Sequence, residues 1–226
     1  MQISKQTFEI LKNFSEINSS ILIKPGQKLE TISEMKNILA KADVPEDFQT
    51  EFGIYDLIEF LNLIDYEIFQ GGNFVFDDKY LTLENGSARS KYYYAAASNI
   101  TSPTKSITMP NSEIKFELKQ EDLIHIRNMA AILHKQDIAI RNINGDIVMS
   151  ILEKKDVTSS TFDLVLGSND ISGNFCMYFK EEYLKIMKGN YDVEISSEAI
   201  SYFRHQDLPL EYWIALEPDS YYDEVQ

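Results

Sequence analysis

Residues 3–17, ISKQTFEILKNFSEI, and residues 118–133, LKQEDLIHIRNMAAIL, set the architecture of this protein. In both stretches apolar residues recur at helical spacing and form one broad face, while charged residues lie on the other. Ser4 comes just before the periodic residues of the first stretch and is its expected N-cap. Each stretch therefore predicts an amphipathic helix. The apolar faces consist of Phe8, Ile10, Leu11, Phe14 and Ile17 in the first helix and of Leu123, Ile126, Met129, Ala130 and Leu133 in the second.

The two predicted helices form a weak internal repeat when they are aligned without gaps. Apolar residues align with apolar residues, and one cation of the first helix aligns with one cation of the second. The aligned pairs are Phe8 with Leu123, Leu11 with Ile126, Lys12 with Arg127, Asn13 with Asn128, and Phe14 with Met129. The chain is therefore expected to contain two similar halves.

Strand patterns and a second short helical pattern follow each of these helices. Hairpins are expected at Pro25–Gly26 within ILIKPGQKLETI and at Asn144–Gly145 within DIAIRNINGDIVMSIL. The second helices are expected over residues 54–64, IYDLIEFLNLI, and residues 180–187, KEEYLKIM. The order predicts an α+β fold of two similar domains, each with an antiparallel sheet and two helices collected on one face.

The division between the halves is predicted at residues 96–112. This stretch is rich in Ala, Ser, Thr and Pro and has no sustained apolar period, which is typical of a linker. It leaves residues 1–95 and 113–226 as an N-terminal and a C-terminal domain, each of a size that small domains commonly have.

Composition narrows the class of protein. The chain has 226 residues, of which 44% are hydrophobic, so it can bury one large core or two ordinary ones. No apolar run approaches the roughly 18 residues that span a bilayer, and MQISKQTFEI lacks the pattern of a signal peptide, so we expect no membrane partner. Cys176 is the only cysteine, which excludes an internal disulfide and agrees with a reducing cytoplasm.

No motif predicts catalysis, a metal or a cofactor. His125 and His134 lie nine residues apart, which does not place two ligands on one face of a helix. The glycines form neither a Walker A loop nor a Rossmann pattern, and the run 166–170, LGSND, is not a serine nucleophile elbow. We expect a protein that is not an enzyme. A hydrolase in which distant carboxylates converge stays open as an alternative.

The net charge of −15 argues against binding to DNA through phosphate contacts alone, because such proteins usually carry a basic balance. This argument from net charge is weaker for a protein that encloses DNA, since a ring around DNA needs only an inner lining that does not repel phosphates. The distribution of charge therefore matters more than the total.

Several short runs, in order along nearly the whole chain, resemble the DNA polymerase sliding clamps, or processivity factors, of T-even-type bacteriophages. The resemblance is strongest near the N-terminus and weakest in the middle of each half. The runs are LKNF at 11–14, INS at 17–19, Lys24, GQ at 26–27, IYDL at 54–57, EDL at 121–123, GNY at 189–191 and ALEPDS at 215–220.

The resemblance implies a head-to-tail homotrimer, a ring of six domains with helices lining the hole and sheets outside. It implies that the partner of the ring is double-stranded DNA, along which the ring slides without regard to base sequence. It further implies the phage DNA polymerase, an ATP-dependent clamp loader and late-transcription proteins as partners, in the cytoplasm of the infected bacterial host. No cofactor is implied.

The candidate DNA-facing residues follow from the helices. If the apolar faces pack on the sheets, the polar faces point into the hole, where cations would contact passing phosphates without reading bases. An ordinary solvated helix face is the alternative, because Glu9 and Glu16 accompany the lysines of the first helix. The candidates are Lys5, Lys12, Arg127, Lys135, Lys185 and Lys188.

A pocket for a partner's short peptide is the second candidate site. Its candidate residues come from the linker and from the last apolar run, and an ordinary strand is the alternative for the latter. They are Ile107, Met109, Pro110, Trp213 and Leu216.

Residues 92–94, three tyrosines, are interpreted as a half-buried strand in preference to a stacking platform for single-stranded nucleic acid.

An acidic two-domain module that binds only proteins remains the alternative function. It would share the fold and the lack of catalysis, and its helix cations would simply be solvated. It differs in forming no closed ring and in giving no DNA-dependent stimulation of a polymerase.

Overall fold

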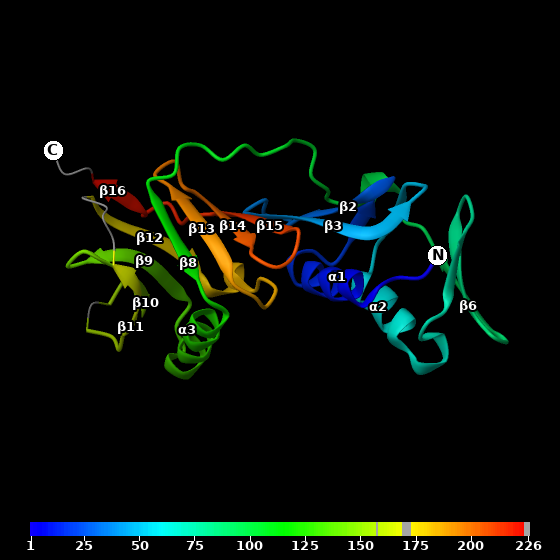
Figure 1. Cartoon of the computed structure of the whole chain (residues 1–226), viewed down its shortest axis with the longest axis horizontal. Helices are drawn as coiled ribbons and strands as arrows, with labels where there is room; N and C mark the ends of the chain where they lie inside the picture. The colour runs from blue at the N-terminus through cyan, green and yellow to red at the C-terminus, as the bar shows by residue number, and fades with distance from the viewer. Residues whose placement is uncertain (157, 169–172, 224–226) are drawn as a thin grey trace. The chain divides into compact units, whose positions relative to one another are not determined.

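The computed structural model describes residues 1–156, 158–168 and 173–223. The chain divides into two compact units, Met1–Ser106 and Ile107–Gln226. Each unit combines antiparallel strands with helices (Figure 1), as the α+β prediction requires. No helix among the described residues is long and apolar enough to cross a membrane.

The first unit contains two antiparallel strand pairs, one three-stranded antiparallel sheet and two α-helices. Strand β1 pairs with β4, β2 pairs with β3, and β5, β6 and β7 form a three-stranded sheet in that order. Helices α1 and α2 pack against each other, and α1 also packs on β3. The elements are α1 Lys5–Ile17, β1 Ile21–Ile23, β2 Gly26–Ile32, β3 Ile38–Phe48, β4 Phe52–Ile54, α2 Leu57–Asp65, the 3-10 helix Glu67–Phe69, β5 Asn73–Phe76, β6 Tyr80–Asn85, β7 Ala88–Tyr93 and the 3-10 helix Ala97–Asn99.

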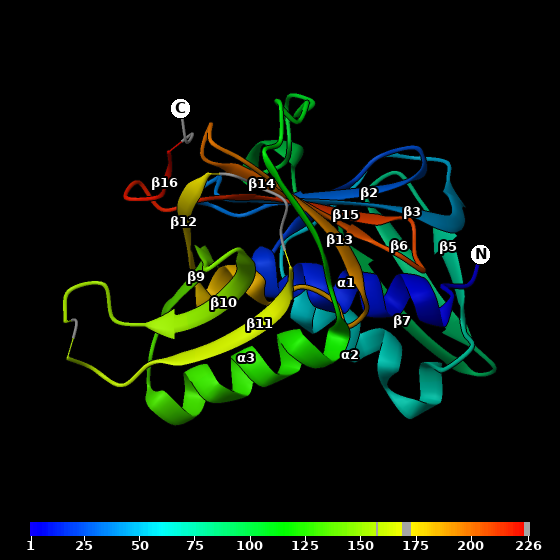
Figure 2. The ribbon, with the colours of Figure 1, turned by 60° about the vertical axis from the view of Figure 1, so that its left-hand side comes forward.

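The second unit contains two larger antiparallel sheets and one α-helix. One sheet has the order β11-β10-β9-β12-β16, and the other joins β8, β13, β14 and β15. Helix α3 packs on β10 and β11 (Figure 2). The elements are β8 Ile114–Leu118, α3 Gln120–Leu133, β9 Asp137–Ile143, β10 Asp146–Leu152, β11 Phe162–Ser168, β12 Asn174–Lys180, the 3-10 helix Glu181–Leu184, β13 Tyr191–Ser196, β14 Ile200–His205, β15 Leu210–Ala215 and β16 Tyr221–Asp223.

Both amphipathic helices are confirmed. Ser4 caps α1 by accepting a hydrogen bond from the backbone N–H of Thr7, and α1 ends where Asn18 leaves helical geometry. Helix α3 ends at His134, whose left-handed conformation terminates the turn. The buried residues of the two helices lie at the predicted spacing: Ile10, Leu11 and Phe14 in α1, and Leu123, Ile126 and Ala130 in α3.

One of the two predicted hairpins is confirmed. Asn144 and Gly145 have φ of 55° and 89° and connect β9 to β10, the geometry of a tight primed turn. The hairpin at Pro25–Gly26 is wrong, because β1 pairs with β4 while β2 pairs with β3. Pro25 has no N–H to donate to a ladder, and Gly26 has a φ of 111°, so the chain changes direction between two sheets here.

The second helix is confirmed in the first unit only. Asp56 caps α2 by accepting from the N–H of Glu59, and Leu57, Phe60 and Leu61 are buried. Within residues 180–187, only Glu181–Leu184 is helical, and it is a short 3-10 helix instead of the predicted α-helix. Leu184 and Ile186 are both buried, and a spacing of two residues suits extended chain better than α-helix.

Candidate nucleic-acid interface

Lys5 and Lys12 come together on α1. They lie seven residues apart, two turns of helix, and both side chains are exposed. Both line a pocket of about 650 Å³ whose apolar wall includes Phe8 and Phe69. Glu9 lines the same pocket, so this surface of α1 carries charges of both signs.

Arg127 and Lys188 come together at α3. They line a pocket of about 470 Å³ together with Ile124 and Asn128. Arg127 Nε lies 3.5 Å from the Glu181 carboxylate, and the two side chains are 37% and 27% exposed. A pair this accessible contributes roughly 0–1 kcal/mol to stability, so a phosphate can replace the carboxylate at small cost.

Lys135 and Lys185 line neither the pocket of Lys5 and Lys12 nor that of Arg127 and Lys188. Lys135 is half-buried, and its ammonium donates a hydrogen bond to Ser159 Oγ, which directs it toward the loop after β10. Lys185 is exposed and lines a small pocket of about 260 Å³ with Glu181 and Glu182. Glu181 lines both this pocket and the pocket of Arg127, so Lys185 and Arg127 border the same acidic residue.

The candidate peptide-binding residues differ in exposure. Trp213 and Leu216 are buried, and the Trp213 ring packs 5.1 Å from that of Tyr202. Ile107, Met109 and Pro110 are half-buried and belong to the irregular segment that precedes β8. The linker residues are therefore the more accessible part of this candidate site.

Tyr92 and Tyr93 belong to the half-buried strand β7, as predicted, and Tyr94 directly follows it. Tyr92 packs on Phe60 with ring centroids 5.1 Å apart, while the next residue, Tyr93, faces solvent. This alternation leaves no continuous aromatic platform on one face of β7.

Glu46 is a residue that the sequence reasoning missed. It lies in β3, is only 7% exposed, and accepts hydrogen bonds from Ser4 N and Thr7 Oγ1 at the start of α1. Burial alone would raise its pKa, but these hydrogen bonds outweigh that effect and hold the pKa below its ordinary value. A charged carboxylate therefore fixes the helix that carries Lys5 and Lys12. The signal was the alternation of Val44, Glu46 and Phe48, which placed a carboxylate on an apolar face.

The edges of two sheets were also missed. Strand β7 is one edge of its three-stranded sheet and carries Arg89 and Lys91, while β11 is one edge of the five-stranded sheet and carries Asp163. Val165 of β11 is 59% exposed. An edge strand offers unpaired backbone groups to another chain. Within the described residues, no cluster of His, Cys, Asp and Glu could hold a metal ion.

Comparison with known proteins adds three findings. Residues 115–218 match the family described as "gp45 sliding clamp, C terminal". The sliding clamp of Vibrio phage KVP40 is 31% identical, covering 96% of this chain and 99% of the relative, and that of Enterobacteria phage T4 is 30% identical, covering 99% and 100%. The fold is similar to that of A. fulgidus PCNA, solved with the C-terminal region of FEN-1 bound, at a TM-score of 0.65 and 14% identity, covering 94% of this chain and 95% of that one.

Proposed function

We infer the function from a premise that the comparisons support: this chain belongs to the sliding clamp family of T-even-type bacteriophages. We propose that it encircles duplex DNA and tethers the phage DNA polymerase for processive replication. The observation that carries the proposal is the similarity to phage clamps along nearly the full length of both chains. The family is non-catalytic, and its phage members act within an infected host. The proposed compartment is the cytoplasm of the bacterial host.

The proposed ring is a head-to-tail homotrimer. Each copy contributes two clamp domains, residues 1–95 and 113–226, joined by the 96–112 linker. A heterologous contact that closes gives a ring, and it needs two different surfaces on each copy. The edges β7 and β11 supply such a pair, because both are edge strands and their side chains differ: β7 carries Arg89 and Lys91, and β11 carries Asp163. Within the chain Arg89 pairs with Glu84 at 3.2 Å and Asp163 with Arg141 at 2.8 Å, solvent-accessible pairs that cost little to exchange. We assign the contact to β7 of one copy and β11 of the next.

The proposed DNA contacts come from the helices. Lys12 and Arg127 hold equivalent positions in the internal repeat, and Lys5 and Lys188 lie beside them in the same two pockets. Lys185 is a further candidate, whereas Lys135 contributes only if it leaves Ser159. Such contacts would be independent of base sequence and readily exchanged, as sliding requires.

The proposed peptide site combines the linker residues Ile107, Met109 and Pro110 with Trp213 and Leu216. Support comes from a protein of the same fold, A. fulgidus PCNA, which binds the C-terminal region of another protein. The half-buried linker residues would make the first contact. The polymerase is the first proposed partner of this site, and the clamp loader and late-transcription proteins are the others.

Primer extension on circular and on linearised DNA tests the function. With the phage polymerase, clamp loader and ATP present, this chain is expected to lengthen products on a primed circle much more than on the same DNA cut open. A ring slides off a free end, whereas a protein held by local contacts does not depend on ends. Equal stimulation on both templates, or none on either, would favour the acidic protein-binding module.

Charge reversal of Lys12 tests the DNA-facing assignment. For Lys12→Glu, we expect the slope of log binding constant against log salt on nicked circular duplex DNA to become less steep by about one for each copy of Lys12 that contacts a phosphate, and so by up to about three for the trimeric ring. Lys28→Glu is the matched control, because Lys28 is an exposed lysine of the same unit that lies on β2 and pairs with Asp43 at 3.7 Å. An equal change in both variants would leave Lys12 an ordinary solvated lysine.

A further inference from the structure

Residues 217–223 run beside β12 and end in β16, the strand at the edge of the five-stranded sheet opposite to β11. We propose that the edge of β12 is a docking site for an extended acidic and aromatic segment of a partner protein, and that residues 217–223 occupy it in cis. We call these residues the strap. The proposal is independent of ring closure, which we assign to β7 and β11.

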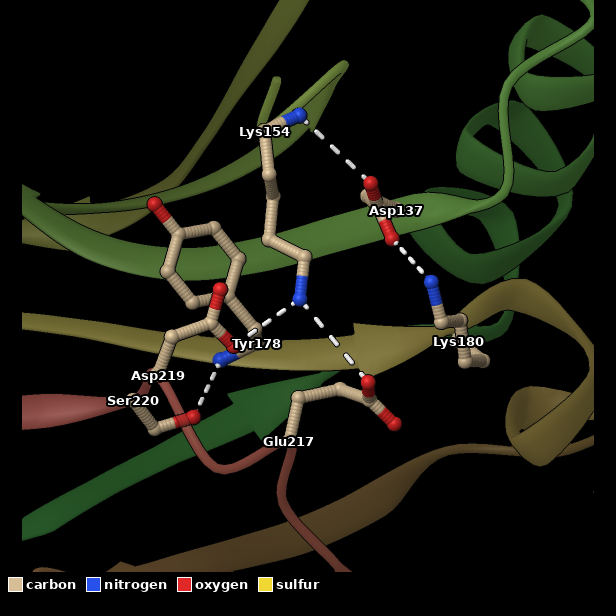
Figure 3. A network of polar contacts seen from close by, with 7 residues as sticks. All are labelled: Asp137, Lys154, Tyr178, Lys180, Glu217, Asp219 and Ser220. Carbon is tan, nitrogen blue, oxygen red and sulfur yellow. Dashed lines mark hydrogen bonds and ion pairs between the residues drawn. The ribbon is translucent and has the colours of Figure 1, made fainter.

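The main chain of the strap and the side chain of Ser220 satisfy backbone groups of β12. Residues 221–223 pair with residues 174–176 in antiparallel register. Glu217 N donates to Tyr178 O at 2.9 Å. Tyr178 N donates to Ser220 Oγ at 2.9 Å, as Figure 3 shows. Without the strap these groups would form an open sheet edge, which is the surface that strand addition uses.

Lys154 gives the site its preference for acidic segments. Its ammonium lies 2.9 Å from Asp219 and 3.8 Å from Glu217, both in the strap, and 4.9 Å from the centre of the Tyr178 ring (Figure 3). The side chain of Lys154 is only 16% exposed. Its hydrogen bond lowers the pKa of Asp219, as expected for a pair that favours the ionised carboxylate.

The neighbouring carboxylate of Asp137 does not replace the strap as the partner of Lys154. Asp137 Oδ1 accepts a hydrogen bond from Lys180 Nζ at 2.6 Å, and its other oxygen faces the backbone N–H of Lys154 at 3.5 Å (Figure 3). An empty site would therefore keep a largely buried ammonium whose carboxylate partners had left. That arrangement attracts an acidic segment and disfavours a basic one.

An aromatic slot lies three residues farther along the strap. The ring of Tyr222 stacks on Phe175 with centroids 6.1 Å apart and an interplanar angle of 14°. A Cβ on Gly173 would lie 2.8 Å from the same ring, so the absence of a side chain there admits it. Asp219 and Tyr222 define the expected pattern of an occupant: an acidic residue followed three residues later by an aromatic one.

Much of the strap lies at the surface of the unit. Its paired part is three residues long, Tyr221 is 44% exposed, and the Asp219 carboxylate faces partly to solvent. Segments that bury little apolar surface open at a small fraction of the global unfolding free energy. A competing segment of similar chemistry can therefore displace the strap without unfolding the unit.

Cys176 reports on this opening. It lies opposite Tyr221 in the β12–β16 ladder, is 6% exposed, and is the only cysteine of the chain. Burial raises the pKa of its thiol, which further slows its reaction. The rate at which a thiol reagent labels Cys176 therefore measures how often the strap leaves β12.

The test uses the full-length chain with a weakened strap and an unchanged receptor edge. We expect the double variant Asp219→Ala, Tyr222→Ala to be labelled at Cys176 at least about tenfold faster than the natural chain. A synthetic peptide with the sequence of residues 217–223, EPDSYYD, should restore protection in this variant. The same peptide carrying the two alanines should not. Lys115→Met, which removes an exposed pair with Glu194 in the same unit, is the control and should leave labelling unchanged.

Two results would overturn the proposal. One is a labelling rate in the double variant equal to that of the natural chain, which would mean that the strap does not govern access to Cys176. The other is faster labelling that the EPDSYYD peptide does not slow, which would mean that the edge accepts no segment in trans. Circular dichroism melting curves of all variants verify that the faster labelling does not come from global unfolding.

Discussion

Val165→Lys is expected to raise the concentration at which the proposed ring falls apart by at least about 100-fold, because like charges opposed across an interface cost several kcal/mol. Val165 lies in the edge strand β11 with 59% of its surface exposed. In the proposed contact it meets β7 of the next copy, which carries Arg89 and Lys91. Sedimentation velocity over a dilution series measures the shift.

Val165→Glu is the matched control, since it adds a charge of opposite sign at the same position. It should weaken assembly much less, because the two cations of β7 then face an anion. An exposed position changes the stability of its own unit by no more than about 0.5 kcal/mol, so the two variants should melt alike. If lysine and glutamate weaken assembly equally, or if neither does, β11 does not face β7.

Glu46→Ala is expected to lower the free energy of unfolding of the first unit by about 2–4 kcal/mol. The substitution leaves Ser4 N and Thr7 Oγ1 without their buried acceptor and removes a negative charge from the start of α1. Urea denaturation followed by circular dichroism measures the loss. Asp47→Ala removes an exposed carboxylate from the next position of β3 and should cost far less.

The same carboxylate predicts a pH dependence. The pKa of Glu46 is lowered from 4.5 in the folded protein, so its contribution is present above that value and is lost as pH falls through the folded pKa. Glu46→Gln should therefore melt closer to the natural protein as the solution becomes more acidic. A gap that stays constant from neutral pH to well below the ordinary pKa of a glutamate would show that folding does not shift the pKa of Glu46, because stability changes with pH only where the folded and unfolded pKa differ.

The helices were predictable because their information is local. A cap at Ser4 and apolar residues spaced by three and four suffice to place α1, and Asn144–Gly145 specifies its turn within two residues. Residues 180–187 misled the prediction because a short apolar run fits a helix or an extended chain about equally well. The tertiary structure buries both Leu184 and Ile186, and the segment keeps only one short 3-10 helix, Glu181–Leu184, followed by non-helical chain.

The missed features depend on residues far apart in the sequence. Glu46 accepts a hydrogen bond from Thr7, which lies 39 residues away in the sequence, and β1 pairs with β4 rather than with the next strand, β2. Whether β7 and β11 are edges depends on the order of strands in a sheet, which a local pattern does not encode. The cations were easier to find than their partners: the sequence placed Lys135 on a polar helix end but not its hydrogen bond to Ser159.

Light scattering by the natural chain over a dilution series tests the central claim, that identical copies close into a ring. The expected mass at micromolar concentration is close to three times the 26.1 kDa of one chain, falling only on strong dilution. A mass of one chain at every concentration, including high micromolar, would contradict a self-closing ring and favour the protein-binding module.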